Sequence, residues 1–300
     1  METNYHNPVL LKESVDGLEI KQDGVYVDVT FGGGGHSREI LDRLGAKGKL
    51  IAFDQDEAAL ANAIKDDRFT LINENFRYLR QFLKFYGIQK VDGILADFGV
   101  SSHQFDDPER GFSTRFDEAL DMRMSTRIHT SARDVLNSYS EGDLKKVFWR
   151  YGELNRAGAM AKAVVASRAT GSITTTEDLK KTLQQFMPRH KENKIMAQIF
   201  QAIRIEVNQE LEAIKEFLLQ SPHVVSQGGR ISLISYHSLE DRLVKRFIRT
   251  GKFEGEVEND FYGNPLAPFK RIGKLIQPST DEIAKNNRAR SARLRIAERL

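Results

Sequence analysis

The chain has 300 residues, of which 40% are hydrophobic and 29% are charged, and its net charge is +3; these values are typical of a water-soluble globular protein of about two domains. It contains no cysteine, which excludes disulfides, zinc sites with thiolate ligands and a cysteine nucleophile, and fits a reducing compartment. The N-terminal residues lack the pattern of a signal peptide and no apolar run approaches the ~18 residues of a membrane span, so we expect a cytoplasmic protein with no membrane partner.

Strands and helices are predicted to alternate through the first hundred residues. Short β-branched and apolar runs predict strands, and apolar residues at helical spacing predict helices. We expect strands at 25–29, 48–54, 68–75 and 91–99, and helices between them at 37–44, 56–65 and 76–87. This alternation with short connections predicts an α/β fold with a doubly wound parallel sheet.

The alternation stops after about residue 110. From 111 to 205 the segments have helical periodicity, with Thr175 or Thr176 as the expected N-cap of one helix, and no convincing strand occurs. A helix at about 206–220 then leads to a fifth strand at 228–238, a further helix, and a remainder (250–300) that we expect to be irregular. We therefore predict one domain made of 1–110 and 206–300, with 111–205 inserted as a helical domain.

The predicted strands of the first hundred residues end in polar and glycine-rich sequence. Gly32–Gly35 follow the first strand, Asp54 ends the second and Asp97 ends the fourth. Ligands of such sheets bind beyond the carboxyl ends of the strands. The sequence therefore predicts a binding site that contains the glycine loop and both carboxylates.

Three ligands compete for the glycine loop. A phosphate-binding P-loop needs a lysine that is absent here, because His36 and Ser37 follow Gly35. A dinucleotide fingerprint would place Ser37 in its third glycine position, which is a poor match. The third ligand is S-adenosylmethionine, which has a sulfonium, an ammonium and a carboxylate but no phosphate, so that backbone amides and acids suit it without a lysine.

Two acids of this region have alternative interpretations. Asp54 is favoured as the acceptor of hydrogen bonds from the two ribose hydroxyls, and its alternative is to cap the helix that follows. Asp28, at the end of the first strand, is as well explained by fixing the loop as by contacting a ligand.

Four long motifs, in register along the chain, resemble the RsmH (MraW) family of bacterial ribosomal RNA methyltransferases. They are "DVTFGGGGHS" (28–37), "DFGVSSHQFDDPERGFSTRFDEALDMRM" (97–124), "ISYHSLEDRLVKRF" (234–247) and "NNRARSARLRIAER" (286–299). The resemblance implies a class I (Rossmann-like) methyltransferase domain interrupted by a helical domain. It also implies methyl transfer from S-adenosylmethionine to the exocyclic N4 amine of a cytidine in the decoding region of 16S ribosomal RNA.

The resemblance also implies which residues contact the cofactor. These are Gly34, Gly35, His36, Asp54, Phe76, Asp97 and Gln104. Phe76 suits an apolar wall for the adenine, and its alternative is a core residue that heads a helix. The alternative for His36 is a cap of the helix after the glycine loop. The chain departs from the family pattern at Gly33, His103, Ser125 and Asn287, which affects the rigidity of loops more than the chemistry.

The catalytic and RNA-binding residues are expected near the strand ends and in the last third of the chain. Asp97 is the candidate catalytic residue, as the acceptor for the target amine, although it could contact the cofactor instead. Tyr236 and His237 could stack on or hydrogen-bond the cytosine, or form a structural turn. Residues 221–300 carry 15 Lys and Arg against 9 Asp and Glu, and within them Arg288 and Arg290 are candidates for phosphate contacts.

The expected partner is small-subunit ribosomal RNA, within the small ribosomal subunit. The oligomeric state is left open, a homodimer included, and no metal site is expected because the seven histidines are scattered. Three rival functions remain at this point: an NAD-dependent oxidoreductase, a non-enzymatic RNA-binding or ribosome assembly factor that keeps a decayed methyltransferase fold, and a methyltransferase that acts on DNA or a small molecule.

Overall fold

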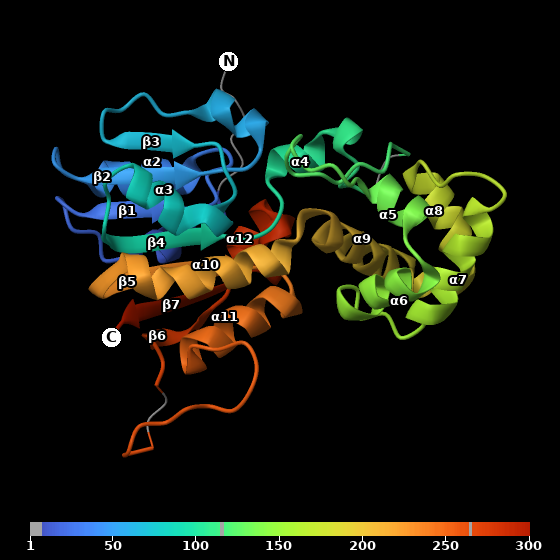
Figure 1. The fold of residues 1–300 in the computed structure, drawn as a ribbon. Helices are drawn as coiled ribbons and strands as arrows, with labels where there is room; N and C mark the ends of the chain where they lie inside the picture. The colour runs from blue at the N-terminus through green and yellow to red at the C-terminus, as the bar shows by residue number, and fades with distance from the viewer. Residues whose placement is uncertain (1–7, 115–116, 264–265) are drawn as a thin grey trace. The chain divides into compact units, whose positions relative to one another are not determined.

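The computed structural model describes residues 8–114, 117–263 and 266–300, and it divides into two compact units (Figure 1). The first unit consists of Met1–Gly99 and Leu211–Leu300, and the second of Val100–Glu210. The expected insertion, 111–205, falls inside the second unit. Within the described residues, no helix is both long enough and apolar enough to cross a membrane. Each unit is described by itself.

The first unit is built on a seven-stranded sheet with the order β3-β2-β1-β4-β5-β7-β6. The strands are β1 (Val25–Asp28), β2 (Lys49–Phe53), β3 (Phe69–Ile72), β4 (Val91–Asp97), β5 (Val225–Ser235), β6 (Phe269–Ile276) and β7 (Arg293–Arg299). Strands β1 to β5 pair in parallel, whereas β7 is antiparallel to both β5 and β6. The predicted α/β, Rossmann-like class is confirmed, with a sheet that is mixed rather than wholly parallel.

The expectation that 250–300 is irregular is wrong, because β6 and β7 lie there. Arg295 of β7 is only 9% exposed and donates from Nε to Asp241 Oδ1 (2.8 Å). The ion pair compensates for the burial of charge in a strand between two others. Strand β6 is an edge strand whose exposed Lys270, Arg271 and Lys274 are typical of edges protected from further pairing.

Helices cover both faces of the sheet. Those of the first unit are α1 (Leu11–Asp16), α2 (Gly35–Arg43), α3 (Leu79–Phe85), α10 (Glu210–Val224, whose first residue is the last of the second unit), α11 (Ser238–Thr250) and α12 (Thr280–Lys285), with short 3-10 helices η1 (Glu57–Asn62), η2 (Phe76–Tyr78) and η6 (Asn287–Ser291). The helix expected at 56–65 is thus a 3-10 helix, and the one expected at 76–87 divides into η2 and α3.

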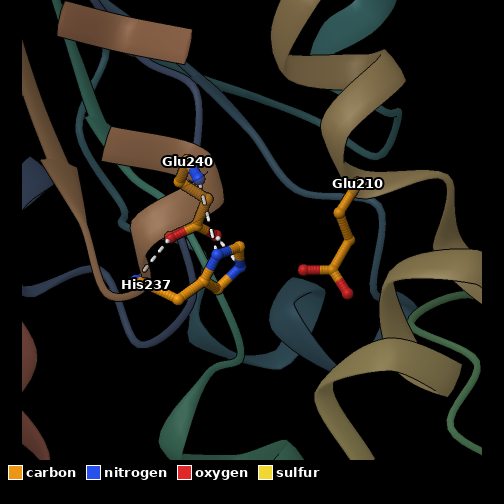
Figure 2. A group of neighbouring side chains, drawn as sticks. All are labelled: Glu210, His237 and Glu240. Atoms are coloured by element: carbon orange, nitrogen blue, oxygen red, sulfur yellow. Dashed lines mark hydrogen bonds and ion pairs between the residues drawn. The ribbon is translucent and has the colours of Figure 1, made fainter. Parts of the chain in front are cut away.

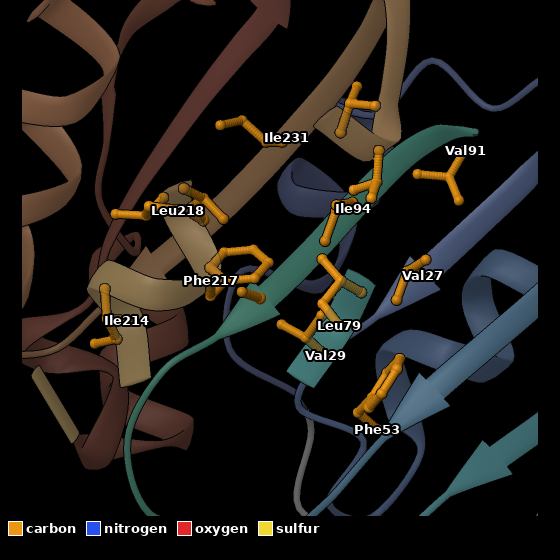
Figure 3. Packing of buried hydrophobic residues seen from close by; sticks show 14 of the residues in the cluster. Val27, Val29, Phe53, Leu79, Val91, Ile94, Ile214, Phe217, Leu218 and Ile231 are labelled. Atoms are coloured by element: carbon orange, nitrogen blue, oxygen red, sulfur yellow. The ribbon is translucent and has the colours of Figure 1, made fainter. Parts of the chain in front are cut away.

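The alternation of side chains along the strands makes two hydrophobic layers. On one face Val27, Ile94 and Ile231 pack with Leu79 of α3 and Phe217 of α10, all of them buried (Figure 3). On the other face the neighbouring strand residues Tyr26, Leu50 and Leu95 pack with Val15 of α1 and with Ile40 and Leu41 of α2. This burial on both faces fixes the register of the central strands, and therefore the place where each strand ends.

The second unit is mainly helical. Its elements are α4 (Ser102–Asp106), η3 (Pro108–Arg110), α5 (Ala132–Ser138), α6 (Glu141–Arg150), α7 (Ala157–Arg168), α8 (Thr176–Leu183), η4 (Gln184–Phe186), η5 (Arg189–Lys191) and α9 (Glu192–Asn208). Thr175 is the N-cap of α8, as predicted, and makes a reciprocal capping box with Asp178. An isolated antiparallel bridge joins Ala119 to Thr175.

Candidate active site

The carboxyl ends of β1, β2 and β4 bring three acids to one edge of the sheet. Asp28 ends β1, Asp97 ends β4, and Asp54 follows β2 by one residue. The chain winds outward in opposite directions from β1 and β4, so these two adjacent strands form the switch point at which open α/β sheets bind ligands. As predicted, Asp54, Asp97 and the glycine loop lie at the same edge of the sheet.

Thr30 ties the ends of β1 and β4 together. Its backbone amide donates to Asp28 Oδ1 (3.1 Å), and its hydroxyl oxygen accepts from the backbone amide of Asp97 (2.7 Å). The other oxygen of Asp28 accepts from the Ser37 hydroxyl (2.7 Å). Asp28 is fully buried and thus fixes the loop, which was one of its two expected roles. The side-chain roles of Thr30 and Ser37 were not predicted from the sequence.

The glycine loop has two separate reasons for its glycines. Gly32 and Gly34 have φ of 52° and 77°, the left-handed region that side chains disfavour, and Gly34 is also the N-cap of α2. Gly35 has an ordinary conformation, but a Cβ there would lie 2.1 Å from Pro8 Cγ. The loop is therefore packed beneath the N-terminal segment, a contact between distant parts of the chain that the sequence did not indicate.

His36 lies in the first turn of α2 and is 5% exposed. Its Nε2 donates to the backbone carbonyl of Val9 (3.1 Å), because a carbonyl oxygen can only accept. The structure shows no side-chain cap at this helix, so the alternative of His36 as a cap is wrong. Burial lowers the pKa of the His36 imidazole, which is therefore neutral at pH 7.

Asp54 connects β2 to the glycine loop. Its Oδ2 accepts from the backbone amide of Gly32 (2.7 Å) and its Oδ1 from that of Asp56 (2.9 Å). The cap of the following 3-10 helix is Asp56, whose side chain accepts from Ala58, so the alternative of Asp54 as the cap is wrong. Each oxygen of Asp54 accepts one of these hydrogen bonds and keeps a lone pair for a ligand.

All three acids have perturbed acidity. Burial raises the pKa of Asp28, of Asp54 and of Asp97 to about 6 in each case. The backbone and hydroxyl hydrogen bonds to Asp28 and Asp54 oppose this rise, as does the Tyr236 hydroxyl for Asp97. Ionised carboxylates held in such surroundings favour a cationic ligand, because a positive charge would stabilise them.

Phe76 and Gln104, the other two predicted cofactor residues, lie in different units. Phe76 is partly buried at the start of η2, with its ring centroid 5.9 Å from that of Phe98 and 5.7 Å from that of Phe217. It thus packs on the core while one part stays accessible. Gln104 belongs to the second unit, where it is 4% exposed and forms a capping box with Ser101 at the start of α4.

Tyr236 and His237 form the turn between β5 and α11. The Tyr236 hydroxyl donates to Asp97 Oδ1 (2.8 Å). His237 is the N-cap of α11: its Nδ1 accepts from the backbone amide of Glu240 (3.4 Å), and its Nε2 lies 3.1 Å from Glu240 Oε1 (Figure 2). Glu240 Oε2 accepts in return from the backbone amides of Tyr236 and His237. Glu210, also drawn there, belongs to the second unit, where it pairs with Arg204.

A cavity of about 270 Å³ opens beside this turn. Its walls are residues 236–238, Gln277 beyond β6, Arg290 and Ser291 of η6, and Arg293 of β7. Three of the predicted substrate residues, Tyr236, His237 and Arg290, therefore share one cavity. Arg288 is half-buried and is not among the residues that line it. Nothing in the sequence pointed to Gln277, Ser291 or Arg293 as neighbours of this turn.

The residues at the sheet edge fit S-adenosylmethionine better than a phosphate ligand. The first turn of α2 has no side-chain cap, so its backbone amides suit a carboxylate, whereas the three acids suit positive charge. The nearby cation Arg38 donates to the carbonyl of Gly33 (2.6 Å) and thus holds the loop. A zwitterion with an additional cationic centre is complementary to these amides and acids. A pyrophosphate would be repelled by the three carboxylates, because both carry negative charge.

Comparison with known proteins decides the family. The sequence pattern of the MraW methylase family matches residues 3–300. The chain belongs to the MraW methylase family. Among the family's curated members, the protein from Flavobacterium johnsoniae is 65% identical over 296 residues, which cover 99% of this chain and 98% of the relative, and its name is Ribosomal RNA small subunit methyltransferase H. The Bacteroides thetaiotaomicron protein of the same name is 53% identical over 299 residues, with the same coverage.

A solved structure gives a more distant likeness. An rRNA methylase from Streptococcus thermophilus aligns over 99% of both chains, with 12% sequence identity and a TM-score of 0.43. The membership of the MraW methylase family confirms the resemblance found in the motifs and makes the protein a methyltransferase.

Proposed function

We propose that the protein transfers a methyl group from S-adenosylmethionine to the exocyclic N4 amine of a cytidine in the decoding region of bacterial 16S ribosomal RNA, in the cytoplasm and within the small ribosomal subunit. The methylase family and the names of the curated relatives support the reaction and the RNA substrate. The observation that carries the proposal is the group of three acids at the carboxyl ends of β1, β2 and β4, beside the glycine loop.

The cofactor is expected to lie along the edge of the sheet. Gly34, Gly35 and His36 start α2 and present backbone amides to its carboxylate, and Asp54 accepts from its ribose. Phe76 packs against the adenine, and Gln104 stays a cofactor contact that the motif resemblance implies. When bound, the cofactor supplies an electrophilic methyl group. The second unit is proposed as the inserted domain that the sequence predicted.

Asp97 is proposed to hold the target amine. Its Oδ1 accepts from the Tyr236 hydroxyl, whereas its Oδ2 accepts no hydrogen bond from the residues that the structure describes. Oδ2 is therefore free to accept from the cytidine N4–H, which orients the nitrogen lone pair and stabilises the positive charge that develops on nitrogen. A carboxyl with a pKa of about 6 is mostly ionised at pH 7.5 and is still basic enough to accept the released proton.

The Asp97→Ala variant tests this function. Purified protein would be incubated with labelled S-adenosylmethionine and undermethylated small subunits, with naked 16S RNA and DNA as parallel substrates. We expect the wild type to label the subunits, and Asp97→Ala to reduce the rate by about 10²–10⁴-fold because general-base contributions have this size. The matched control is Asp67→Ala, since Asp67 is exposed and precedes β3, at the amino end of that strand rather than at the carboxyl ends that form the site. A normal rate in Asp97→Ala would refute the role of Asp97, and a wild type that labels only DNA would refute the substrate.

A further inference from the structure

The cavity beside the β5–α11 turn is lined by groups that donate hydrogen bonds. Arg290 and Arg293 contribute guanidinium groups, Ser291 a hydroxyl and Gln277 an amide. The seven described residues that line it include no carboxylate. The chemistry of its walls is therefore that of an anion site.

Three of these donors are not engaged elsewhere. The side chains of Gln277, Arg290 and Ser291 are exposed and make no hydrogen bond or ion pair with any residue that the structure describes. They come from the end of β6 and from η6, so the sheet and the final 3-10 helix bring them together. Free donors from separate elements that line one cavity indicate a site for an acceptor-rich ligand.

Two acids, Asp241 and Glu240, contact residues that line the cavity. Asp241 accepts from Arg293 (3.1 Å) and, with both oxygens, from Arg295 (2.8 and 3.1 Å), so this trio has a net charge of +1. Glu240 is buried, and its Oε2 accepts from the amides of Tyr236 and His237. Arg290 adds a positive charge and Glu240 a negative one, so these five residues keep a net charge of +1, which favours an anion in the cavity.

The cavity is adjacent to the proposed catalytic carboxylate. Tyr236 lines the cavity and also donates from its hydroxyl to Asp97 Oδ1 (2.8 Å). Tyr236 therefore borders both sites, so an RNA strand that enters the cavity is next to the proposed catalytic carboxylate.

We propose that this cavity is a phosphate site, in which Arg290, Ser291 and Gln277 bind an RNA backbone phosphate next to the nucleotide whose base reaches Asp97. His237 is then a structural cap of α11 rather than a contact to the cytosine. The inference rests on the proposed function, because it takes the anion to be the phosphodiester of the RNA substrate. The basic C-terminal segment then positions the RNA strand through a specific phosphate contact, in addition to attracting RNA by its overall charge.

The test is the salt dependence of binding to undermethylated small subunits, measured by filter binding and independently of methyl transfer. Arg290→Gln is expected to weaken binding and to reduce the slope of log K against log salt by roughly 0.7–0.9, the value for one lost phosphate contact. Arg290→Lys is expected to keep the slope, because it keeps the charge. The matched control is Arg80→Gln, an exposed arginine of α3, which should leave the slope unchanged.

The outcomes separate this inference from the proposed function. An Arg290→Gln variant with the wild-type affinity and slope overturns the inference, even if methyl transfer is normal. A wild type that binds subunits with the expected slope but transfers no methyl group contradicts the proposed function and leaves the phosphate site in place. Titration with inorganic phosphate alone gives a third arm: tight binding that Arg290→Gln abolishes, without any effect on subunit binding, would assign the cavity to a small anion and refute the RNA contact.

Discussion

At the scale of single residues, the three strand-end acids link the fold to its chemistry. Each is desolvated by the sheet edge, and Asp28 and Asp54 also hold the glycine loop through backbone or hydroxyl donors. In the folded, ligand-free protein it therefore costs free energy to ionise these three carboxyl groups, and a bound cation would lower that cost. In this view part of the free energy of cofactor binding comes from relieving that cost.

This predicts that affinity for S-adenosylmethionine depends on pH around 6. The folded pKa of Asp28, Asp54 and Asp97 is raised to about 6 from an ordinary value of 3.8, so the ligand-free protein takes up protons there. A cationic ligand prefers the ionised acids, so affinity should fall as the pH falls from 7.5 to 5, and binding near pH 6 should release protons. Calorimetry in two buffers of different ionisation enthalpy measures both quantities. An affinity that stays constant from pH 5 to pH 8 would contradict this explanation.

The same shifts have a consequence for stability. An acid whose pKa is higher in the folded state contributes stability below its unfolded pKa of 3.8, and this contribution is lost as the pH rises through about 6. The three acids therefore lower the free energy of unfolding of the ligand-free protein at pH 7.5 relative to pH 5, and saturating cofactor should restore it.

Several residue-scale features followed from the sequence and others did not. Asp54, Asp97 and the glycine loop could be placed at one edge because strand ends are visible as a change from apolar to polar sequence. The hydrogen-bond partner of His36 could not be predicted from the sequence. Val9 is 27 positions away, and the contact depends on how the N-terminal segment packs against α2. The roles of Asp54, Asp97 and Arg290 in the reaction remain predictions.

At the scale of elements, the parallel strands were predictable and the last two were not. Strands β1, β2 and β4 are buried apolar runs bounded by glycine or acids, which is a strong local signal. Strand β7 contains three arginines, and its burial depends on the partner Asp241 in α11. A strand that is stabilised by a distant ion pair has no local signature, so tertiary structure decides it.

The packing of the N-terminal segment on α2 gives an element-scale prediction. Replacing Gly35 by Ala would place a Cβ 2.1 Å from Pro8 Cγ, and one of the two segments must then move. We expect Gly35→Ala to lower the free energy of unfolding by about 1–3 kcal/mol, as overpacking does, and to weaken cofactor binding through the displaced loop. Thermal and urea unfolding, with calorimetry for the cofactor, measure the two effects.

Gly142→Ala in α6 is the control for this substitution. The nearest atom to its added Cβ is Ser140 Oγ at 3.7 Å, which is ordinary contact. Alanine in a helix should then be neutral or stabilise by up to about 1 kcal/mol. If both variants unfold at the wild-type urea concentration, the N-terminal segment does not constrain the loop.

At the scale of the whole molecule, charge is distributed in a way that matches the proposed partner. Residues 1–100, which contain all the candidate cofactor residues except Gln104, carry 12 Lys and Arg against 16 Asp and Glu, whereas residues 221–300 have a surplus of six positive charges. The acidic part suits a cationic donor, and the basic part suits RNA. The sequence predicted a change from strand–helix alternation to helices alone after about residue 110, and the second unit, Val100–Glu210, is mainly helical.

The most direct test of the central claim is calorimetry of S-adenosylmethionine with purified, ligand-stripped protein at pH 7.5. We predict a single site for the wild type, and for Asp54→Asn an affinity lower by about 10–100-fold, which is the range expected for the loss of a charged hydrogen-bond acceptor. Asp67→Asn, at an exposed acid outside the site, should bind as the wild type does. A wild-type protein that is folded and shows no affinity for S-adenosylmethionine would contradict the assignment of the sheet edge as the cofactor site.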